Sequence, residues 1–424
     1  MTAVVAILNT QGIAIAADSA VTSNGRISNN ALKIFTLSKY QPVGVAIYGN
    51  SSFLATPWET IIKIYRSKLK DKSFPSLSDY QKDFIQFLHD KSFFCDPSFS
   101  DDWVKYSIRN FLDNLVFGAA KKNWDNGNNA DKLQKLNTEI NTISSQVTVL
   151  SICTEFTDYT YETFTSDYGA LVSAIILEMT SSHSIVIDDP TTELISTLAY
   201  SFIKCQEFFS PFTGIVFVGY GEDQVFPAIT PIRVYFPVKT RLRYWCEGMN
   251  TIEISNTNST GIVPFAQTDA MNTLLKGIAP KLETELQNQF LSFFQDYNKI
   301  ILALIGDGMP DLTTAVNNID TKGFLTKFQE AIVKTQNTHY INPLHSSISS
   351  LTKEALAEMA ESLIYLTFMQ KRITLEPENM GGNVDVAIIS KGDGFIWIKR
   401  KHYFKRELNE HFFANYFNDS TKHD

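Results

Sequence analysis

The residues near the amino terminus include four whose types suit hydrolysis of an amide by an N-terminal nucleophile: Thr2, Asp18, Lys33 and Gly49. Thr2 follows the initiator Met1, and a second residue this small permits an aminopeptidase to remove the methionine. The freed threonine would carry a hydroxyl and an α-amine, and the reference pKa of such an amine, about 7.7–8.0, suits a general base. The amine could take the proton from Thr2 Oγ directly or through one water, so the chemistry requires no histidine.

The other three residues have roles in the same chemistry. The Lys33 ammonium would lower the pKa of the amine by like-charge repulsion, and the Asp18 carboxylate would hold that lysine in place. Gly49 would let a substrate carbonyl approach a backbone N–H, which stabilises an oxyanion. Each residue also has a plainer interpretation: Asp18 as a turn carboxylate, Lys33 as a solvated strand lysine and Gly49 as the end of a strand.

Short strands and one helix would have to position these residues. Residues 3–8 and 13–17 are apolar runs around a polar turn, which predicts a β-hairpin. Both runs are apolar on successive residues, as in strands covered on both faces. Residues 32–37 and 43–48 predict a second strand pair, and residues 52–70 have the apolar spacing of one helical face.

The rest of the chain alternates between helical patterns and hairpins. Helical patterns occupy residues 106–120, 170–179, 193–208, 267–278, 283–304 and 352–369. Strand patterns occupy residues 147–153, the pair 214–219 and 229–236, and the pair 384–390 and 395–399. Hairpins separated by groups of helices predict an α+β protein of antiparallel sheets with helices packed outside.

Composition narrows the class of protein. The chain has 424 residues, a hydrophobic content of 44% and a charged content of 19%, which favours a large folded core over disorder. The net charge of −8 argues against a general binder of nucleic acid or of anionic membranes. The four cysteines lie far apart without a CxxC pair, so a zinc ribbon and a disulfide scaffold are both disfavoured.

The sequence was also searched for segments that would direct the chain to a membrane or out of the cell. The apolar opening segment lacks a positively charged n-region, which argues against a signal peptide. No other stretch has the uninterrupted apolar length that spans a bilayer. We therefore expect a soluble, cytoplasmic protein.

Residues 2–37, TAVVAILNTQGIAIAADSAVTSNGRISNNALKIFTL, resemble the N-terminal region of proteasome β-type subunits, including the bacterial relative that forms the peptidase ring of an ATP-dependent protease. The family pattern is an N-terminal threonine, a hairpin, an A-D-S-x-x-T segment, a lysine before a hydrophobic strand, and a strand that ends at a glycine. Residues 52–69 resemble the first long helix of the family. Two downstream segments resemble its central hairpin and the hairpin after its Gly-Gly turn: residues 214–236 and 380–401.

The resemblance implies the fold of the N-terminal nucleophile hydrolases, an αββα sandwich of two antiparallel sheets between helical layers. It implies Thr2 as nucleophile and base, Asp18 and Lys33 as the charge pair, and Gly49 as the oxyanion donor. It also implies a peptide or protein substrate, a homo-oligomer, an ATPase or activator as a conceivable partner, and no cofactor or metal. The chain is then one enlarged domain (1–424) with core pieces 2–70, 211–278 and 352–406 and insertions 71–210 and 279–351.

The sequence departs from the family before the Gly-Gly turn. The family carries an aspartate and a serine there, whereas this chain has Met380 in the place of the serine, and Glu376 and Glu378 are candidates for the aspartate. Ser255 and Ser259 are candidates for a further serine of the family. These departures leave three functions open: a threonine-type peptidase, an inactive structural or assembly subunit, and an amidase of the same fold that acts on non-peptidic substrates.

Three other polar segments have simpler explanations. His183 with Asp188 and Asp189 lacks helical metal-ligand spacing and predicts a polar loop. Residues 306–311 lack the ligand pattern of a calcium loop and predict a turn. The basic cluster at residues 399–406 predicts a solvated strand edge or a subunit contact rather than a nucleic-acid site, because the chain is acidic overall.

Overall fold

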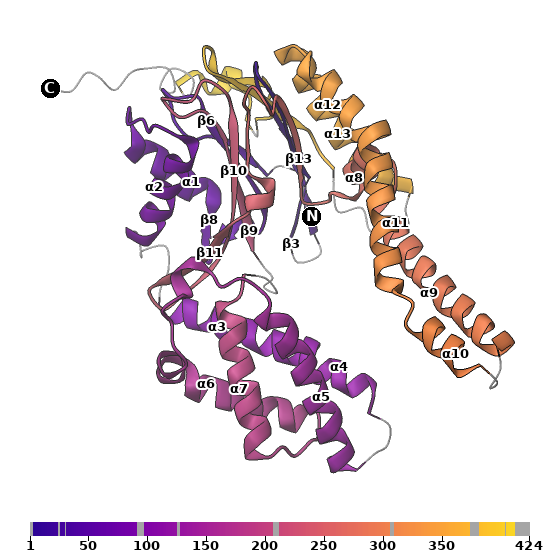
Figure 1. The fold of residues 1–424 in the computed structure, drawn as a ribbon. Helices are drawn as coiled ribbons and strands as arrows, with labels where there is room; N and C mark the ends of the chain where they lie inside the picture. Colours follow the sequence, from indigo (N-terminus) through magenta and orange to yellow (C-terminus); the bar gives the residue numbers. More distant parts are fainter. Residues whose placement is uncertain are drawn as a thin grey trace. The chain divides into compact units, whose positions relative to one another are not determined.

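The chain forms two compact units in the computed structural model (Figure 1). Unit 1 comprises Met1–Ile34, Val225–Pro227 and Glu253–Asp424, and unit 2 comprises Phe35–Gln224 and Ala228–Ile252. The structure describes residues 3–23, 26–29, 31–90, 97–124, 128–206, 212–305, 309–373, 381–402 and 404–411. Each unit combines an antiparallel sheet with helices, which confirms the predicted α+β class. The stacking of one sheet on the other and the single enlarged domain stay predictions.

The sheet of unit 1 contains both predicted hairpins of its part of the chain. Its described strands have the order β13–β1–β2–β14–β15. Their bounds are Val4–Asn9 for β1, Gly12–Ala17 for β2, Thr260–Phe265 for β13, Asp385–Ser390 for β14 and Gly394–Lys399 for β15. Every residue of β1 and β2 is buried, as expected for strands covered on both faces. A short pair, β3 (Val21–Ser23) and β4 (Arg26–Ser28), follows β2.

Helix α13 (Lys353–Ile373) covers one face of this sheet. Its buried residues Leu356, Ala360 and Ile364 recur at helical spacing and join Val5 and Ile7 of β1 in one apolar cluster. Helices α8 (Asp269–Lys276) and α12 (Asn342–Ser349) contribute to the same cluster. Figure 1 shows α12 and α13 beside β13.

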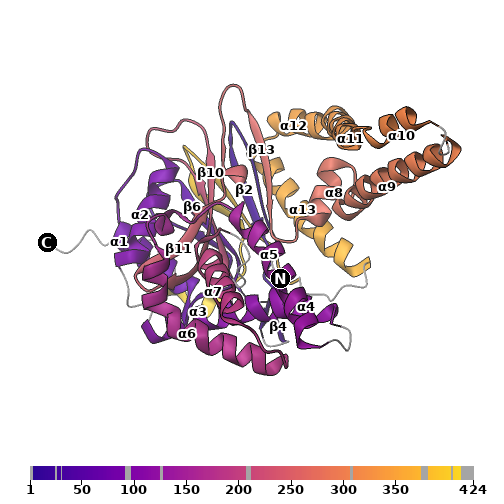
Figure 2. The ribbon, with the colours of Figure 1, turned by 60° about the horizontal axis from the view of Figure 1, so that its bottom comes forward.

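Between α8 and α12 the chain forms an extension of helices. It consists of α9 (Pro280–Ile305), α10 (Pro310–Asn317), α11 (Thr321–Gln336) and a π-helical turn (Asn337–Ile341). Phe290 of α9 stacks on Phe328 of α11 with ring centroids 4.1 Å apart. Figure 2 shows α9, α10 and α11 extending away from the sheet of unit 1.

The sheet of unit 2 has the described strand order β11–β10–β9–β6–β5, and β12 (Ile252–Glu253) pairs with β10. The bounds are Ile34–Thr36 for β5, Val43–Gly49 for β6, Thr213–Gly219 for β9, Ala228–Val238 for β10 and Arg241–Cys246 for β11. The predicted hairpin of residues 214–219 and 229–236 is therefore confirmed, as is the neighbouring pair of residues 32–37 and 43–48. Strand β11 follows β10 after a short turn and was not predicted.

Helices α1 (Trp58–Leu69) and α2 (Leu77–Asp90) belong to unit 2. The predicted apolar face of α1 is buried, but the helix begins at Trp58 rather than Ser52, because the preceding residues form the short strands β7 (Ser52–Phe53) and β8 (Thr56–Pro57). Phe84 of α2 packs between Trp58 and Phe217 of β9, with ring centroids 6.5 and 5.5 Å away. The two helices thus pack on this sheet through aromatic rings.

A helical bundle occupies most of residues 97–204. It consists of α3 (Pro97–Phe111), a π-helical turn (Leu112–Phe117), α4 (Gly118–Lys122), α5 (Asn129–Thr148), α6 (Tyr161–Ser182) and α7 (Asp189–Lys204). The predicted strand at residues 147–153 is wrong. Val147 completes the buried stripe of α5, which also contains Ile140 and Ile143, and the following residues form only an isolated bridge between Ile152 and Cys205.

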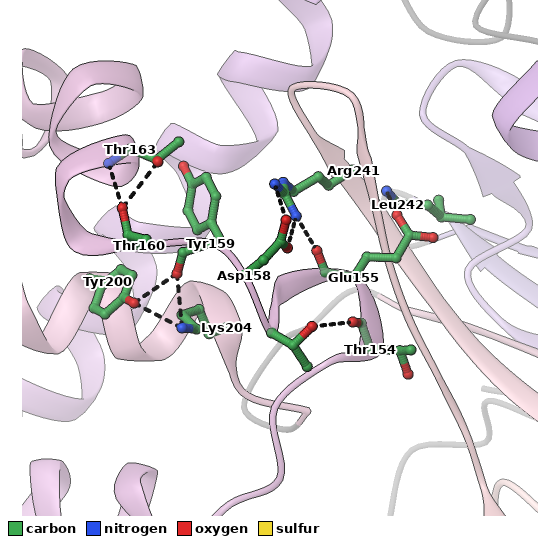
Figure 3. Close-up of polar contacts among 11 residues, drawn as sticks. Thr154, Glu155, Asp158, Tyr159, Thr160, Thr163, Tyr200, Lys204, Arg241 and Leu242 are labelled. Carbon is green, nitrogen blue, oxygen red and sulfur yellow. Dashed lines mark hydrogen bonds and ion pairs between the residues drawn. The ribbon is translucent and has the colours of Figure 1, made fainter.

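A polar loop joins the bundle to the edge of the sheet in unit 2 (Figure 3). The Arg241 guanidinium on β11 donates to Asp158 Oδ1 and to the Glu155 carbonyl, each at 2.5 Å. The Tyr159 carbonyl accepts hydrogen bonds from Tyr200 and Lys204 of α7 at 2.8 and 2.9 Å. This loop therefore binds both a strand and a helix.

Candidate active site

The β1–β2 hairpin positions Asp18 at the start of the described chain. Val4 pairs with Ala17, the last residue of β2, so Ala3 and Asp18 continue the same register. Asp18 N donates to the Ala3 carbonyl at 3.2 Å, and Ala3 N donates to Asp18 Oδ1 at 2.9 Å. The Asp18 carboxylate therefore accepts a hydrogen bond from the residue that directly follows Thr2 in the sequence.

Asp18 and Lys33 form a buried ion pair. Lys33 Nζ lies 2.6 Å from Asp18 Oδ1 and 2.6 Å from the Ala20 carbonyl, and the two residues are only 3% and 1% exposed. Asp18 Oδ2 also accepts from Ala20 N at 3.2 Å. Burial of two charges is costly unless they are paired and hydrogen-bonded, and here both conditions are met. The pair thus holds the ammonium at a fixed place, and its part in catalysis stays a prediction.

The surroundings favour a more acidic lysine. Burial lowers the pKa of Lys33 below its ordinary value of 10.5, the charge and hydrogen bond of Asp18 oppose that shift, and the charge of Lys401 adds to it. The Asp18 carboxylate beside Nζ favours the charged form of Lys33 and so opposes the effect of burial.

A second pair, Asp385 and Lys401, lies in the same part of unit 1. Asp385 begins β14 opposite Ala17, and its Oδ1 accepts from Lys401 N at 2.9 Å. Lys401 Nζ donates to the Ala31 carbonyl at 2.6 Å, and Ala31 N donates to the Ser19 carbonyl at 3.1 Å. Lys401 therefore binds the backbone two residues before Lys33.

Both groups of the second pair have shifted pKa values. Burial raises the pKa of Asp385 above its ordinary 3.8, although hydrogen bonding from Lys401 and its charge oppose the shift. Burial lowers the pKa of Lys401 below 10.5, against the opposing charges of Asp385 and Asp18. The charges of Asp385 and Lys401 also act on Lys33, and the charge of Asp18 acts on Lys401, so the two pairs influence each other electrostatically.

Sequence reasoning missed Asp385 and Lys401. Asp385 stands inside the apolar run of residues 384–390, where a charged residue in a buried strand is itself a signal. Lys401 was included in the basic cluster at residues 399–406 and interpreted as part of a solvated edge. Its neighbours Lys399 and His402 are exposed, whereas Lys401 is partly buried.

The other residues that the sequence analysis named as candidates for the site are either not described or lie on the surface. Thr2, Met1, Glu376, Glu378 and Met380 lie outside the described residues. Among the candidate serines, Ser255 closes a turn by accepting from Asn258 N at 3.1 Å, and Ser259 is exposed.

Gly49 ends β6 in unit 2 and has a structural reason to be glycine. Its φ is +82°, and a Cβ at this position would lie 2.4 Å from the Phe212 carbonyl oxygen. Asn50 N donates to the same oxygen at 2.8 Å. Its role as oxyanion donor stays a prediction.

His183 and Asp188 match the simpler interpretation of a polar loop, whereas the turn predicted for residues 306–311 does not extend to Pro310 and Asp311, which begin α10. His183 Nε2 bonds Asp113 Oδ1 at 2.8 Å, and Asp188 caps α7 by accepting from Thr191 N at 2.9 Å. Of residues 306–311, the first three lie outside the described part. Within the described ranges, no group of three or more His, Cys, Asp or Glu side chains could hold a metal ion. No described helix is both long and apolar enough to cross a bilayer.

Comparisons with known proteins give little further guidance. No protein-family model matches the chain, and no curated protein matches it. Among solved structures, the chain is similar to Anbu (ancestral beta-subunit) from Yersinia bercovieri, with 8% sequence identity and a TM-score of 0.27 over 97% of this chain and 93% of that one.

Proposed function

We propose that the chain is a threonine-type hydrolase of peptide amide bonds whose nucleophile is Thr2, exposed by removal of Met1. The observation that carries the proposal is the hydrogen bond from Ala3 N to Asp18, together with the buried ion pair of Asp18 with Lys33. Residue 2 is covalently bonded to that Ala3 nitrogen. Perturbed, buried charge pairs cluster at functional sites, and this pair is hydrogen-bonded to the residue that follows Thr2 in the sequence.

The proposed reaction proceeds by acyl transfer. The α-amine of Thr2 accepts the hydroxyl proton, and Thr2 Oγ attacks the amide carbonyl of the substrate. The tetrahedral intermediate expels the amine product, which takes a proton, and leaves an ester on Thr2. The freed α-amine then activates a water, whose attack releases the carboxylic acid and restores the hydroxyl.

Lys33 would tune this chemistry through its charge. An ammonium close to the α-amine lowers the pKa of that amine and raises the fraction of free base at neutral pH. Asp18 and the Ala20 carbonyl leave the ammonium little freedom to move, since each lies 2.6 Å from Nζ. In this role Lys33 and Asp18 act through Thr2, and Gly49 supplies the donor for the oxyanion.

Other finer features belong to the same proposal. The substrate is a peptide or protein, the enzyme acts in the cytoplasm as a homo-oligomer, and an ATPase or activator is a conceivable partner. There are two alternative functions: an inactive structural subunit and an amidase for non-peptidic substrates. Both would have the same fold as the proposed peptidase.

Hydrolysis assays of the purified full-length chain test the proposal. We expect release of fluorophore from a mixed set of peptide amides, a loss to background in Thr2→Ala, and a decrease of about 10²-fold or more in Lys33→Met. Thr10→Ala is the matched control, because Thr10 is an exposed threonine in the β1–β2 turn, and its rate should equal that of the wild type. Turnover of simple acyl amides alone would indicate the amidase, and no turnover of either set would indicate the structural subunit.

A further inference from the structure

The C-terminal part of unit 1 binds the backbone beside both members of the buried ion pair. Strand β14 pairs with β2 as far as Ala17, the residue before Asp18. Lys401 Nζ donates to the Ala31 carbonyl at 2.6 Å, two residues before Lys33 and 370 positions away in the sequence. The β14–β15 hairpin and the residues just after it therefore contact both of the segments that must meet for the ion pair to form.

The backbone of Lys401 is itself held in place by Asp385. Lys401 N donates to Asp385 Oδ1 at 2.9 Å, and Asp385 is only 2% exposed. Lys399, the last residue of β15, is exposed, whereas Lys401 is partly buried. The buried carboxylate thus fixes the point from which the Lys401 side chain reaches the Ala31 carbonyl.

The segment that carries Lys33 is bound through several of its groups. Ala31 N donates to the Ser19 carbonyl at 3.1 Å, and the Ala31 carbonyl accepts from Lys401. Lys33 Nζ in turn donates to the Ala20 carbonyl at 2.6 Å. Because the peptide of Ala31 lies only two residues before Lys33, loss of the Lys401 donor would free the chain directly beside the lysine that pairs with Asp18.

The charge of Lys401 also acts on Lys33. Burial makes the largest contribution to the lowered pKa of Lys33, and the charge and hydrogen bond of Asp18 oppose it. The charge of Lys401 lowers this pKa further, and the charge of Asp385 raises it. Two other basic residues of the same segment act on Asp385: Arg400 and His402. Lys401 is therefore a cationic neighbour whose removal would favour the charged form of Lys33.

We propose that Lys401 is a positioning residue for Lys33: its side chain holds the segment that carries Lys33, and its charge acts on that ammonium. The proposal rests on the proposed hydrolase function, in which the charge of Lys33 acts on the α-amine of Thr2. Lys401 has no part in the bond-making steps and affects the reaction through Lys33.

Amide hydrogen exchange of the full-length chain tests the hold on the segment without any assay of activity. Lys401→Met keeps the N–H that Asp385 accepts but removes the donor to Ala31, so we expect faster exchange of the Ala31 amide. Lys401→Arg keeps a charged donor and should exchange like the wild type. Lys399→Met is the matched control, since the Lys399 ammonium is exposed and binds Glu361 instead. Wild-type exchange of Ala31 in Lys401→Met would overturn the proposal.

The pH profile of peptide hydrolysis tests the effect of the charge. Lys33 must carry its proton in the proposed reaction, so kcat should fall at high pH as Lys33 loses it. Lys401→Met removes a cationic neighbour and raises the pKa of Lys33, so this fall should move to higher pH. At neutral pH, kcat should decrease about tenfold or more through misplacement of Lys33, with little change in KM. Lys401→Arg should restore both the wild-type profile and the wild-type kcat.

The two measurements separate this proposal from the hydrolase function. A lower kcat in Lys401→Met with an unmoved high-pH fall would mean a structural role alone and would refute the action of its charge. A wild type without turnover would refute the hydrolase function, and hydrogen exchange would then still decide whether Lys401 holds the segment of Lys33.

Discussion

Asp18 and Lys33 form an ion pair that is almost completely buried, so each charge is stabilised mainly by the other. We expect Asp18→Asn to lower the free energy of unfolding by about 3–5 kcal/mol, because it leaves the Lys33 ammonium buried without its counter-charge. Urea denaturation at neutral pH measures the difference.

The double variant Asp18→Asn with Lys33→Met is the control for this prediction. It removes both charges together, so it should recover part of the stability that the single variant loses. If Asp18→Asn alone unfolds at the same urea concentration as the wild type, the pair does not stabilise the fold in the way described.

Asp385 gives a prediction about pH. Burial raises its pKa above 3.8 in the folded chain. A carboxyl with a raised pKa binds more protons in the folded state, so its stabilising contribution is complete below the unfolded value and is lost as the pH rises through the folded value. Asp385→Asn keeps an oxygen acceptor for Lys401 N but does not titrate. The free energy of unfolding of the wild type should therefore decrease relative to that of the variant as the pH rises from about 3.8 toward neutrality.

Urea titrations of both proteins at a series of pH values measure this decrease. If the free energy of unfolding differs between wild type and variant by the same amount at every pH, burial does not shift the pKa of Asp385.

The pairing of Asp18 with Lys33 could be predicted because both residues lie in the N-terminal segment that resembles the proteasome β-type subunits. Asp385 and Lys401 come from the opposite end of the chain. They approach Ala17 and Ala31 only through the pairing of β14 with β2, which depends on tertiary structure. No spacing in the sequence encodes that contact, although a charged residue in an apolar strand indicates where to look.

At the scale of single elements, the end of β6 depends on a glycine. Gly49→Ala should lower the free energy of unfolding by about 1–3 kcal/mol, because φ is positive and the added methyl meets the Phe212 carbonyl. Gly392→Ala is the control, since a Cβ there has no atom within 4 Å. Thermal unfolding of the two variants measures the contrast, and equal melting temperatures would contradict it.

The loop of Figure 3 should respond locally to the loss of Arg241. Arg241→Met removes the hydrogen bonds to Asp158 and to the Glu155 carbonyl. We expect faster amide hydrogen exchange in residues 154–160, with little change in β9, because β9 is hydrogen-bonded to β6 on one side and to β10 on the other. Unchanged exchange in that loop would show that Arg241 does not hold it.

The elements themselves were predictable to different degrees. The hairpins β1–β2 and β14–β15 follow from continuous apolar runs around turn residues, which is a local signal. Helix α5 was not recognised, because polar residues separate the members of its stripe, and its last turn was interpreted as a strand from the apolar run that follows. Strand β11 is half-buried and contains two arginines, so its pattern is weak.

At the scale of the whole molecule, the two regions predicted as insertions differ in character. The bundle of residues 97–204 has a large apolar core, in which Phe111 stacks on Phe202 at 3.9 Å. The extension of α9, α10 and α11 instead leaves an apolar stripe exposed, and α9 has no buried residue. One region is thus packed in a large apolar core that it shares with β10 and β11, whereas the other exposes apolar side chains on α9.

The central claim is that Thr2 is an N-terminal nucleophile, and intact-mass analysis tests it most directly. The purified chain, produced with its own Met1, is weighed before and after treatment with an epoxyketone that reacts with an N-terminal threonine. We predict a chain that lacks Met1 and gains one inhibitor molecule, and a Thr2→Ala chain that gains none. Retention of Met1, or equal labelling of Thr2→Ala, would contradict the claim.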